Sequence, residues 1–127
     1  MQGRFLVLTG ALLGAAAISS SANELVELRV NGRYFSEPAT IRMIVMVEPD
    51  QANRTLRIEA DGDRFFRSTE LNLEGLSEKR LHAVEFKNLP AGWYELRAEV
   101  RSGKEVRAMA SQELTVVGRE IADQSDQ

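Results

Sequence analysis

The stretch Tyr94-Glu95-Leu96-Arg97-Ala98-Glu99-Val100 alternates apolar and charged side chains at every position. Successive side chains of a β-strand point to opposite faces of its sheet, so this alternation predicts a strand with one face in a core and the other in water. Residues 56–60 alternate in the same way. These two stretches therefore predict two half-buried strands and point to an all-β fold.

Charge predicts how the two strands pair. Antiparallel pairing with Ile58 opposite Ala98 gives the polar face two cross-strand pairs of opposite charge. These pairs are Arg57 with Glu99 and Glu59 with Arg97. A shift by two residues would place like charges opposite one another, so we predict the first register.

The rest of the chain shows further short alternating or apolar runs that are separated by turn residues. The expected strands are residues 26–30, 40–47, 56–60, 64–73, 81–86, 94–100 and 106–117. No helical crossover separates them, so we predict a seven-stranded antiparallel two-sheet sandwich. For the last hairpin we expect a three-residue loop at 102–104, with Val100 opposite Val106 and a bulge near Gln112.

Composition excludes several function classes. The 127 residues allow one domain, and 16 basic against 19 acidic side chains give a net charge of −3, which argues against a nucleic-acid-binding surface. The sequence has no cysteine and one histidine, which removes disulfides, thiolate metal sites and cysteine nucleophiles. We therefore expect no cofactor and no metal.

The N-terminus has the pattern of an export signal. Arg4 precedes an apolar run at residues 5–18, and small residues follow up to Ala22. Fourteen helical residues span about 21 Å, which is short of the roughly 30 Å hydrocarbon core of a bilayer. We expect a cleaved signal-peptide helix at 1–22, a folded domain at 23–118, a disordered tail at 119–127, and a periplasmic or secreted location.

One motif resembles a known family. The run Leu89-Pro90-Ala91-Gly92-Trp93-Tyr94-Glu95-Leu96 is similar to the corner before the sixth strand of immunoglobulin-like and fibronectin III-like domains in small bacterial exported proteins. The resemblance implies an immunoglobulin-like sandwich and no activity. It also implies a structural corner, formed by Leu89, Pro90, Gly92 and Tyr94, in which the tyrosine hydroxyl caps the crossing.

The candidate chemical groups favour structural roles. His82 alternates with Val84 and Phe86 on an expected strand and has no second histidine or cysteine to form a metal site, so we predict a structural role. Asp61-Gly62-Asp63 lacks the remaining ligands of a calcium loop and is typical of a tight turn. No catalytic constellation is apparent, so we predict that the protein is not an enzyme.

One surface stands out as a candidate binding rim. In the predicted register, Trp93 begins its strand beside the end of the neighbouring strand, and Arg64, one of Phe65 or Phe66, and Arg67 follow that end. We take Phe65 as the second aromatic member of the rim. Aromatic and arginine side chains dominate many binding interfaces. The alternative is that the aromatic rings cover the open end of the core, with the arginines laid over them.

The sequence thus predicts an exported, non-enzymatic interaction or structural module of the bacterial cell envelope. The first alternative is a glycan- or small-ligand-binding domain that uses the rim around Trp93. The second is a small hydrolase whose site the sequence does not show. The expected partner is another envelope or secreted protein, or a glycan. We expect no nucleic acid and no membrane insertion after signal cleavage.

Overall fold

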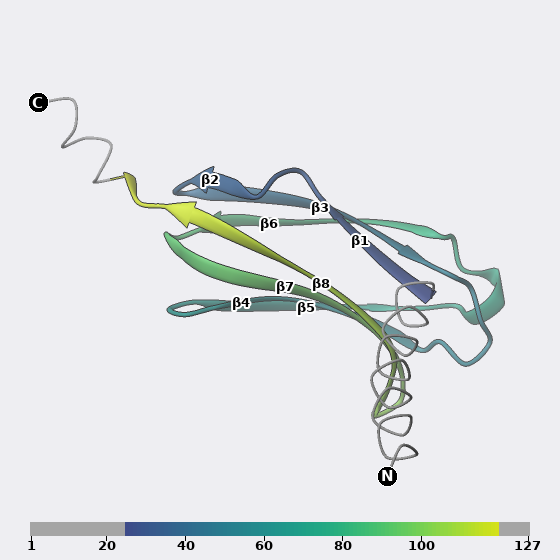
Figure 1. The fold of residues 1–127 in the computed structure, drawn as a ribbon. Coiled ribbons are helices and arrows are strands. Elements are labelled where there is room, and N and C mark those ends of the chain that lie inside the picture. The colour runs from purple at the N-terminus through teal and green to yellow at the C-terminus, as the bar shows by residue number, and fades with distance from the viewer. Residues whose placement is uncertain (1–24, 120–127) are drawn as a thin grey trace, which may run out of the picture.

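The computed structural model describes residues 25–119 and consists of β-strands with one short 3₁₀ helix (Figure 1). The expected signal segment and nearly all of the expected tail lie outside these residues. The strands are β1 (Val26–Val30), β2 (Tyr34–Ser36), β3 (Ala39–Val47), β4 (Thr55–Gly62), β5 (Phe66–Asn72), β6 (Leu81–Leu89), β7 (Gly92–Ser102) and β8 (Glu105–Val117), and the 3₁₀ helix is η1 (Gly75–Ser77). Within the described residues, no helix is long and apolar enough to cross a membrane.

The strands form two sheets, so the predicted all-β, two-sheet architecture is confirmed. The smaller sheet has the order β1-β3-β6, and the larger has the order β2-β8-β7-β4-β5. Figure 1 shows that the larger sheet curls strongly along β7 and β8. On this side β1 of the smaller sheet contacts both β7 and β8, so the two sheets approach each other closely there.

The prediction of seven strands, all antiparallel, is wrong, because the described residues form eight. The additional strand, β2, pairs in parallel with the end of β8, where Tyr34 lies opposite Thr115. A three-residue strand is too short to show a periodic pattern, and it directly follows a region that reads as a turn at Asn31-Gly32. The sequence therefore gives no signal for this edge of the larger sheet.

The core lies between the inner faces of the two sheets. Both alternating stretches contribute to it, and Leu56, Ile58 and Leu96 are each completely buried. The smaller sheet contributes Ile41, Met43 and Val45 from its central strand. Burial of these apolar side chains is the main term that stabilises the two-sheet fold.

The predicted register between β4 and β7 is confirmed. Ile58 lies opposite Ala98, which places Arg57 beside Glu99 and Glu59 beside Arg97. Two constraints agree here, since the apolar side chains must face the core and the opposite charges pair on the outer face. This agreement makes the pair predictable from sequence.

The predicted register of the last hairpin is wrong. Ser102 pairs with Glu105, which leaves a two-residue loop, and Val100 lies opposite Ala108 rather than Val106. The irregularity lies between Val100 and Arg101, close to the turn, and not near Gln112. The loop is one residue shorter than predicted, which shifts the pairs by one position, and an extra residue on β8 adds one more, so every later pair is shifted by two.

The corner before β7 has the contacts that the motif implies. Leu89 and Tyr94 are buried, and the Tyr94 hydroxyl donates a hydrogen bond of 2.6 Å to the carbonyl oxygen of Pro90. Burial of the phenol, and secondarily the negative charge of Asp63, raise the pKa of Tyr94. Gly92 has a φ of 154°, and a Cβ there would lie 2.8 Å from the Asp63 carboxylate, so the corner needs glycine. The corner fixes Tyr94 in the core and turns Trp93 to the opposite face.

Candidate ligand-binding surface

Three large aromatic side chains lie exposed on the outer face of the larger sheet. Tyr34 is 79% exposed on β2, Trp93 is 46% exposed on β7, and Phe66 is 50% exposed on β5. Tyr34 and Trp93 both lie opposite Thr115 of β8, so Tyr34, Thr115 and Trp93 form one row across three neighbouring strands. The sheet thereby holds two aromatic rings on either side of a small residue.

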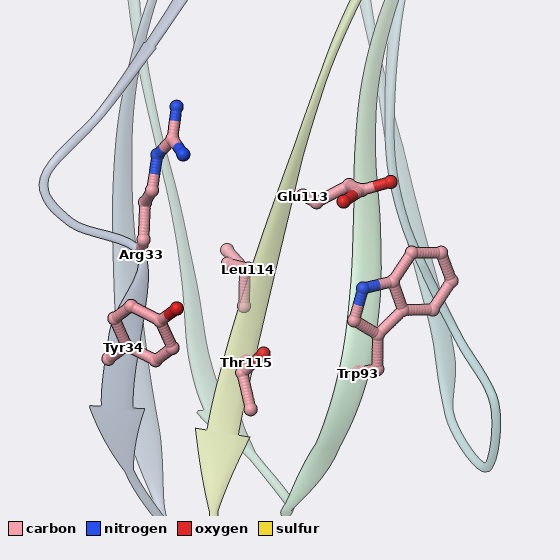
Figure 2. Close-up of a pocket in the computed structure, with 6 residues that line it drawn as sticks. All are labelled: Arg33, Tyr34, Trp93, Glu113, Leu114 and Thr115. Atoms are coloured by element: carbon pink, nitrogen blue, oxygen red, sulfur yellow. The ribbon is translucent and has the colours of Figure 1, made fainter.

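A shallow hollow lies between the two rings of this row. It is lined by Arg33, Tyr34, Trp93, Glu113, Leu114 and Thr115 and has a volume of about 110 Å³ (Figure 2). Figure 2 shows the phenol oxygen of Tyr34 and the indole nitrogen of Trp93 turned toward β8, with Arg33 and Glu113 at one end. The hollow is too small to enclose a drug-sized molecule, so a ligand here would rest on the surface.

The charged groups beside the hollow lack partners. Within the described part of the chain, neither Glu113 nor the guanidinium of Arg33 makes a side-chain hydrogen bond or an ion pair. Glu113 also lies directly opposite Glu95 on the neighbouring strand. Like charges in this position destabilise a sheet, so Glu113 has no evident structural purpose.

The middle of the same outer face is different, because its charges bind one another. Arg97 donates hydrogen bonds to Glu95 at 2.7 Å, to Asp61 at 3.1 Å and to Glu59 at 3.3 Å. Burial opposes the charged form of the guanidinium, but the bonds from Asp61 and Glu59 outweigh it and raise the pKa of Arg97. Arg57 adds a second ion pair to Glu59, at 3.2 Å. This network has few groups free to bind a ligand.

The structure does not gather the four residues of the expected rim. Trp93 lies on the outer face, whereas Phe65 packs against the core. The guanidinium of Arg67 lies 5.1 Å from the centre of the Phe65 ring and donates a hydrogen bond to the carbonyl oxygen of Lys87. Arg64 is exposed between β4 and β5. A binding role for this set stays a prediction, and Phe66 takes the outward position beside the sheet.

Tyr34 is the residue of this surface that the sequence did not predict, and the choice between Phe65 and Phe66 was left open there. The strand before Trp93 could be paired correctly, but the face of a phenylalanine in the Phe65-Phe66 pair depends on where β5 begins. Phe66 lies opposite Asp61, whose side chain is on the outer face, and this pairing assigns its direction. For Tyr34 the only available signal was the aromatic pair Tyr34-Phe35 directly after a turn.

His82 is buried on β6, an edge strand of the smaller sheet. It is 5% exposed, and its Nε2 atom has no hydrogen-bond partner among the described residues. Asp61 and Asp63 serve the structure through bonds to Arg97 and to the backbone nitrogen of Trp93. Among residues 25–119, no three or more His, Cys, Asp or Glu side chains are placed to hold a metal ion.

Comparisons with known proteins give a fold relationship. No protein-family model and no curated protein match the sequence. Solved structures of two variants of superoxide reductase (neelaredoxin) from Ignicoccus hospitalis are similar to this chain. The first has a TM-score of 0.55 and 15% sequence identity, and the match covers 80% of this chain and 87% of that chain. The second has a TM-score of 0.51 and 13% identity and covers 71% and 79%, respectively.

These similarities correct the predicted family. The fold resembles that of superoxide reductase, and the resemblance to immunoglobulin-like and fibronectin III-like domains is wrong as a fold assignment. The corner motif is local, and it sets neither the order of the strands nor the curl of the larger sheet. An identity of 13–15% establishes similarity of fold alone.

The functional predictions based on that family are contradicted as well. We expected a non-enzymatic interaction or structural module of the envelope, or else a binding domain built on the four-residue rim. The structures similar to this chain bear the name of an enzyme, so the fold no longer favours a non-enzymatic classification. The comparisons also give no support for secretion, which stays a prediction.

Proposed function

We propose that this chain binds a saccharide on the outer face of the larger sheet, at the surface between Tyr34 and Trp93. The observation that carries the proposal is the row of two exposed aromatic rings that flank Thr115 beside unpaired charged groups. A sugar ring has an apolar face of C–H groups that stacks on an aromatic ring and an edge of hydroxyls that needs hydrogen bonds. Amphipathic aromatic side chains suit such a half-apolar ligand.

The polar groups at this surface match the hydroxyls of a sugar. Glu113 can accept hydrogen bonds at two carboxylate oxygens, while Arg33 can donate several from its fork. The phenol of Tyr34 and the indole N–H of Trp93 add a hydroxyl and a donor turned toward the same hollow (Figure 2). Bonds to ionised groups are stronger than neutral ones, so Glu113 and Arg33 would supply much of the orientation.

The predicted export signal is consistent with this ligand class. An exported domain would meet the saccharides of the cell envelope, and its net charge of −3 does not favour an anionic lipid or nucleic acid. A proline-rich peptide is the main rival ligand, because such peptides also dock on exposed aromatic side chains.

Superoxide reduction is an electron transfer and needs a redox-active group. Proteins hold redox metals with sets of imidazole, thiolate or carboxylate ligands. The sequence has no cysteine, and its one histidine, His82, has an unpartnered Nε2 but belongs to no group of three or more candidate metal ligands among the described residues. The donor set does not fit a redox metal, so we propose no redox step for this chain.

Titration calorimetry with neutral disaccharides tests the proposal. We expect binding by the wild type and a loss of at least tenfold in affinity for Trp93→Ala, since central aromatic side chains often contribute about 2 kcal/mol or more. Leu76→Ala is the matched control, because Leu76 is a 68% exposed apolar side chain on η1, away from the hollow. Binding of a polyproline peptide and of no saccharide would overturn the proposal.

A further inference from the structure

The third exposed aromatic side chain extends the proposed binding surface across the whole larger sheet. Phe66 lies on β5, the edge strand opposite β2, and its partner Asp61 points to the same outer face as Trp93. In the order β2-β8-β7-β4-β5, the three aromatic residues occupy every second strand. Neighbouring strands lie about 4.8 Å apart, so successive aromatic positions are separated by roughly 10 Å across the sheet.

The strand register places the three aromatic residues along a shallow diagonal. Tyr34 and Trp93 share one row, and Phe66 lies in the row of Asp61, Glu95 and Glu113. The two rows are two residues apart on β7, which is about 7 Å. The residue of β4 between Trp93 and Phe66 is Asp61, which accepts a hydrogen bond from Arg97.

Charge along this diagonal selects the kind of ligand. Three carboxylates lie in the row beside it, and Arg97 donates hydrogen bonds to two of them, Glu95 and Asp61. The third, Glu113 on β8, receives no such bond from a described residue. A ligand with a carboxylate or sulfate on each sugar unit would be repelled along this row.

We propose that the ligand is an extended chain of uncharged sugars that lies across the strands and stacks on Tyr34, Trp93 and Phe66 in turn. This inference rests on the proposed saccharide binding. It assigns Phe66 as a specificity residue for chain length, and it assigns the carboxylate row to the exclusion of acidic polysaccharides.

The test is calorimetric titration of the wild type and of Phe66→Ala with neutral di-, tetra- and hexasaccharides. We expect the affinity of the wild type to rise with length, by about tenfold or more from di- to hexasaccharide. Phe66→Ala should bind the disaccharide with the affinity of the wild type, but its affinity should not rise in the same way with the length of the saccharide. A thermal melt of the variant shows whether it is folded, and Ser68→Ala, at the next outward position of β5, is the control.

The outcomes separate the two proposals. The extended site would be overturned if the wild type bound the disaccharide but its affinity did not rise with saccharide length. It would also be overturned if the affinity of Phe66→Ala rose with length as in the wild type. Either result would leave saccharide binding intact. Tighter binding of an oligouronate than of the neutral chain would overturn the assignment of the carboxylate row. If no saccharide of any length bound, both the extended site and the proposed function would fail. If Phe66→Ala showed no cooperative thermal transition and was therefore unfolded, Phe66→Leu would take its place, since leucine keeps much of the apolar volume but lacks the aromatic face.

Discussion

On the outer face of the larger sheet, charged side chains bond to one another in one half and lack such bonds in the other. In the middle of the sheet, Arg97 satisfies three carboxylates and leaves Glu59 only 7% exposed. Beside β2, by contrast, Glu113 and Arg33 have no partners within the described residues, although they lie next to exposed aromatic rings. Both halves belong to the same face of one sheet, so the strand pattern alone does not explain the difference.

This difference separates a structural role of charge from a functional one. Charges that are bonded to one another stabilise the sheet or at least offset their own desolvation. Unpaired charges beside exposed aromatic side chains contribute nothing of this kind and are typical of a surface kept available for a ligand. The comparison therefore predicts opposite responses when charges in the two halves are removed.

The largest expected effect is in the paired half. Arg97→Ala removes the donor of four hydrogen bonds to three carboxylates and, among the described residues, leaves Glu59 with Arg57 as its partner. A poorly solvated carboxylate that loses part of its pairing is costly, so we expect a loss of about 2 kcal/mol in the free energy of unfolding, measured in urea.

A second arginine on a strand supplies the control for this measurement. Arg29 pairs with Glu27 at 2.8 Å, but the two side chains are 70% and 48% exposed. Exposed pairs contribute little, so Arg29→Ala should change the free energy of unfolding by less than about 0.5 kcal/mol. Equal effects of the two substitutions would show that the network around Arg97 has no special role.

The next effect concerns the corner that orients Trp93. Tyr94→Phe removes the hydrogen bond to Pro90 and should cost about 1 kcal/mol in urea unfolding. Tyr34→Phe is the matched control, since that side chain is 79% exposed and its hydroxyl has no partner among residues 25–119. A Tyr94→Phe variant as stable as the wild type would show that the hydroxyl bond does not hold the corner.

The same tyrosine predicts a dependence of stability on alkaline pH. The pKa of Tyr94 is raised by folding, first because burial disfavours the phenolate and then through Asp63. Its contribution is therefore complete below the ordinary tyrosine pKa of about 10 and is lost as the pH rises through the higher value in the folded state. We expect the wild type to lose stability above about pH 10 more steeply than Tyr94→Phe, as measured by thermal melts from pH 9 to 12.

The accuracy of the sequence analysis followed the number of constraints that acted on each element. The pairing of β4 with β7 was predictable because core direction and cross-strand charge required the same register. The register of the β7–β8 hairpin depends on the length of its loop and on a bulge, and a loop shorter by one residue together with one extra residue on β8 shifted it by two. β2 has three residues and no period, so neither the strand nor the position of Tyr34 could be predicted.

The family resemblance failed for a related reason. Tyr94 and Pro90 form the contact that the corner motif implies. A contact between residues four positions apart carries no information on strand order. The order β2-β8-β7-β4-β5 depends on contacts between segments far apart in the sequence. The sequence also did not predict that Arg67 turns toward Phe65 and β6, because this direction depends on where β5 begins.

The smallest expected effect is the sharpest test of the comparison, because the substitution should increase the free energy of unfolding, whereas the substitutions above should decrease it. Glu113→Gln removes the like-charge opposition to Glu95 and breaks no ion pair. We expect the variant to be more stable than the wild type by about 0.3 kcal/mol, because directly opposed like charges destabilise a sheet by a few tenths of a kcal/mol. In a domain of this size, that gain should raise the melting temperature by roughly 2 °C at low salt.

Glu59→Gln is the control for this prediction, since it is the same chemical change in the paired half. There the substitution weakens bonds from Arg57 and Arg97 to a nearly buried side chain, so stability should fall by about 1 kcal/mol. The gain in Glu113→Gln should disappear in 1 M salt, where exposed charges are screened, while its affinity for a neutral disaccharide should fall several-fold because a charge-assisted hydrogen bond is lost. If Glu113→Gln were less stable than the wild type, this carboxylate would have a stabilising partner in solution. The charged side chains of both halves of the outer face would then be paired, and the two halves would not differ.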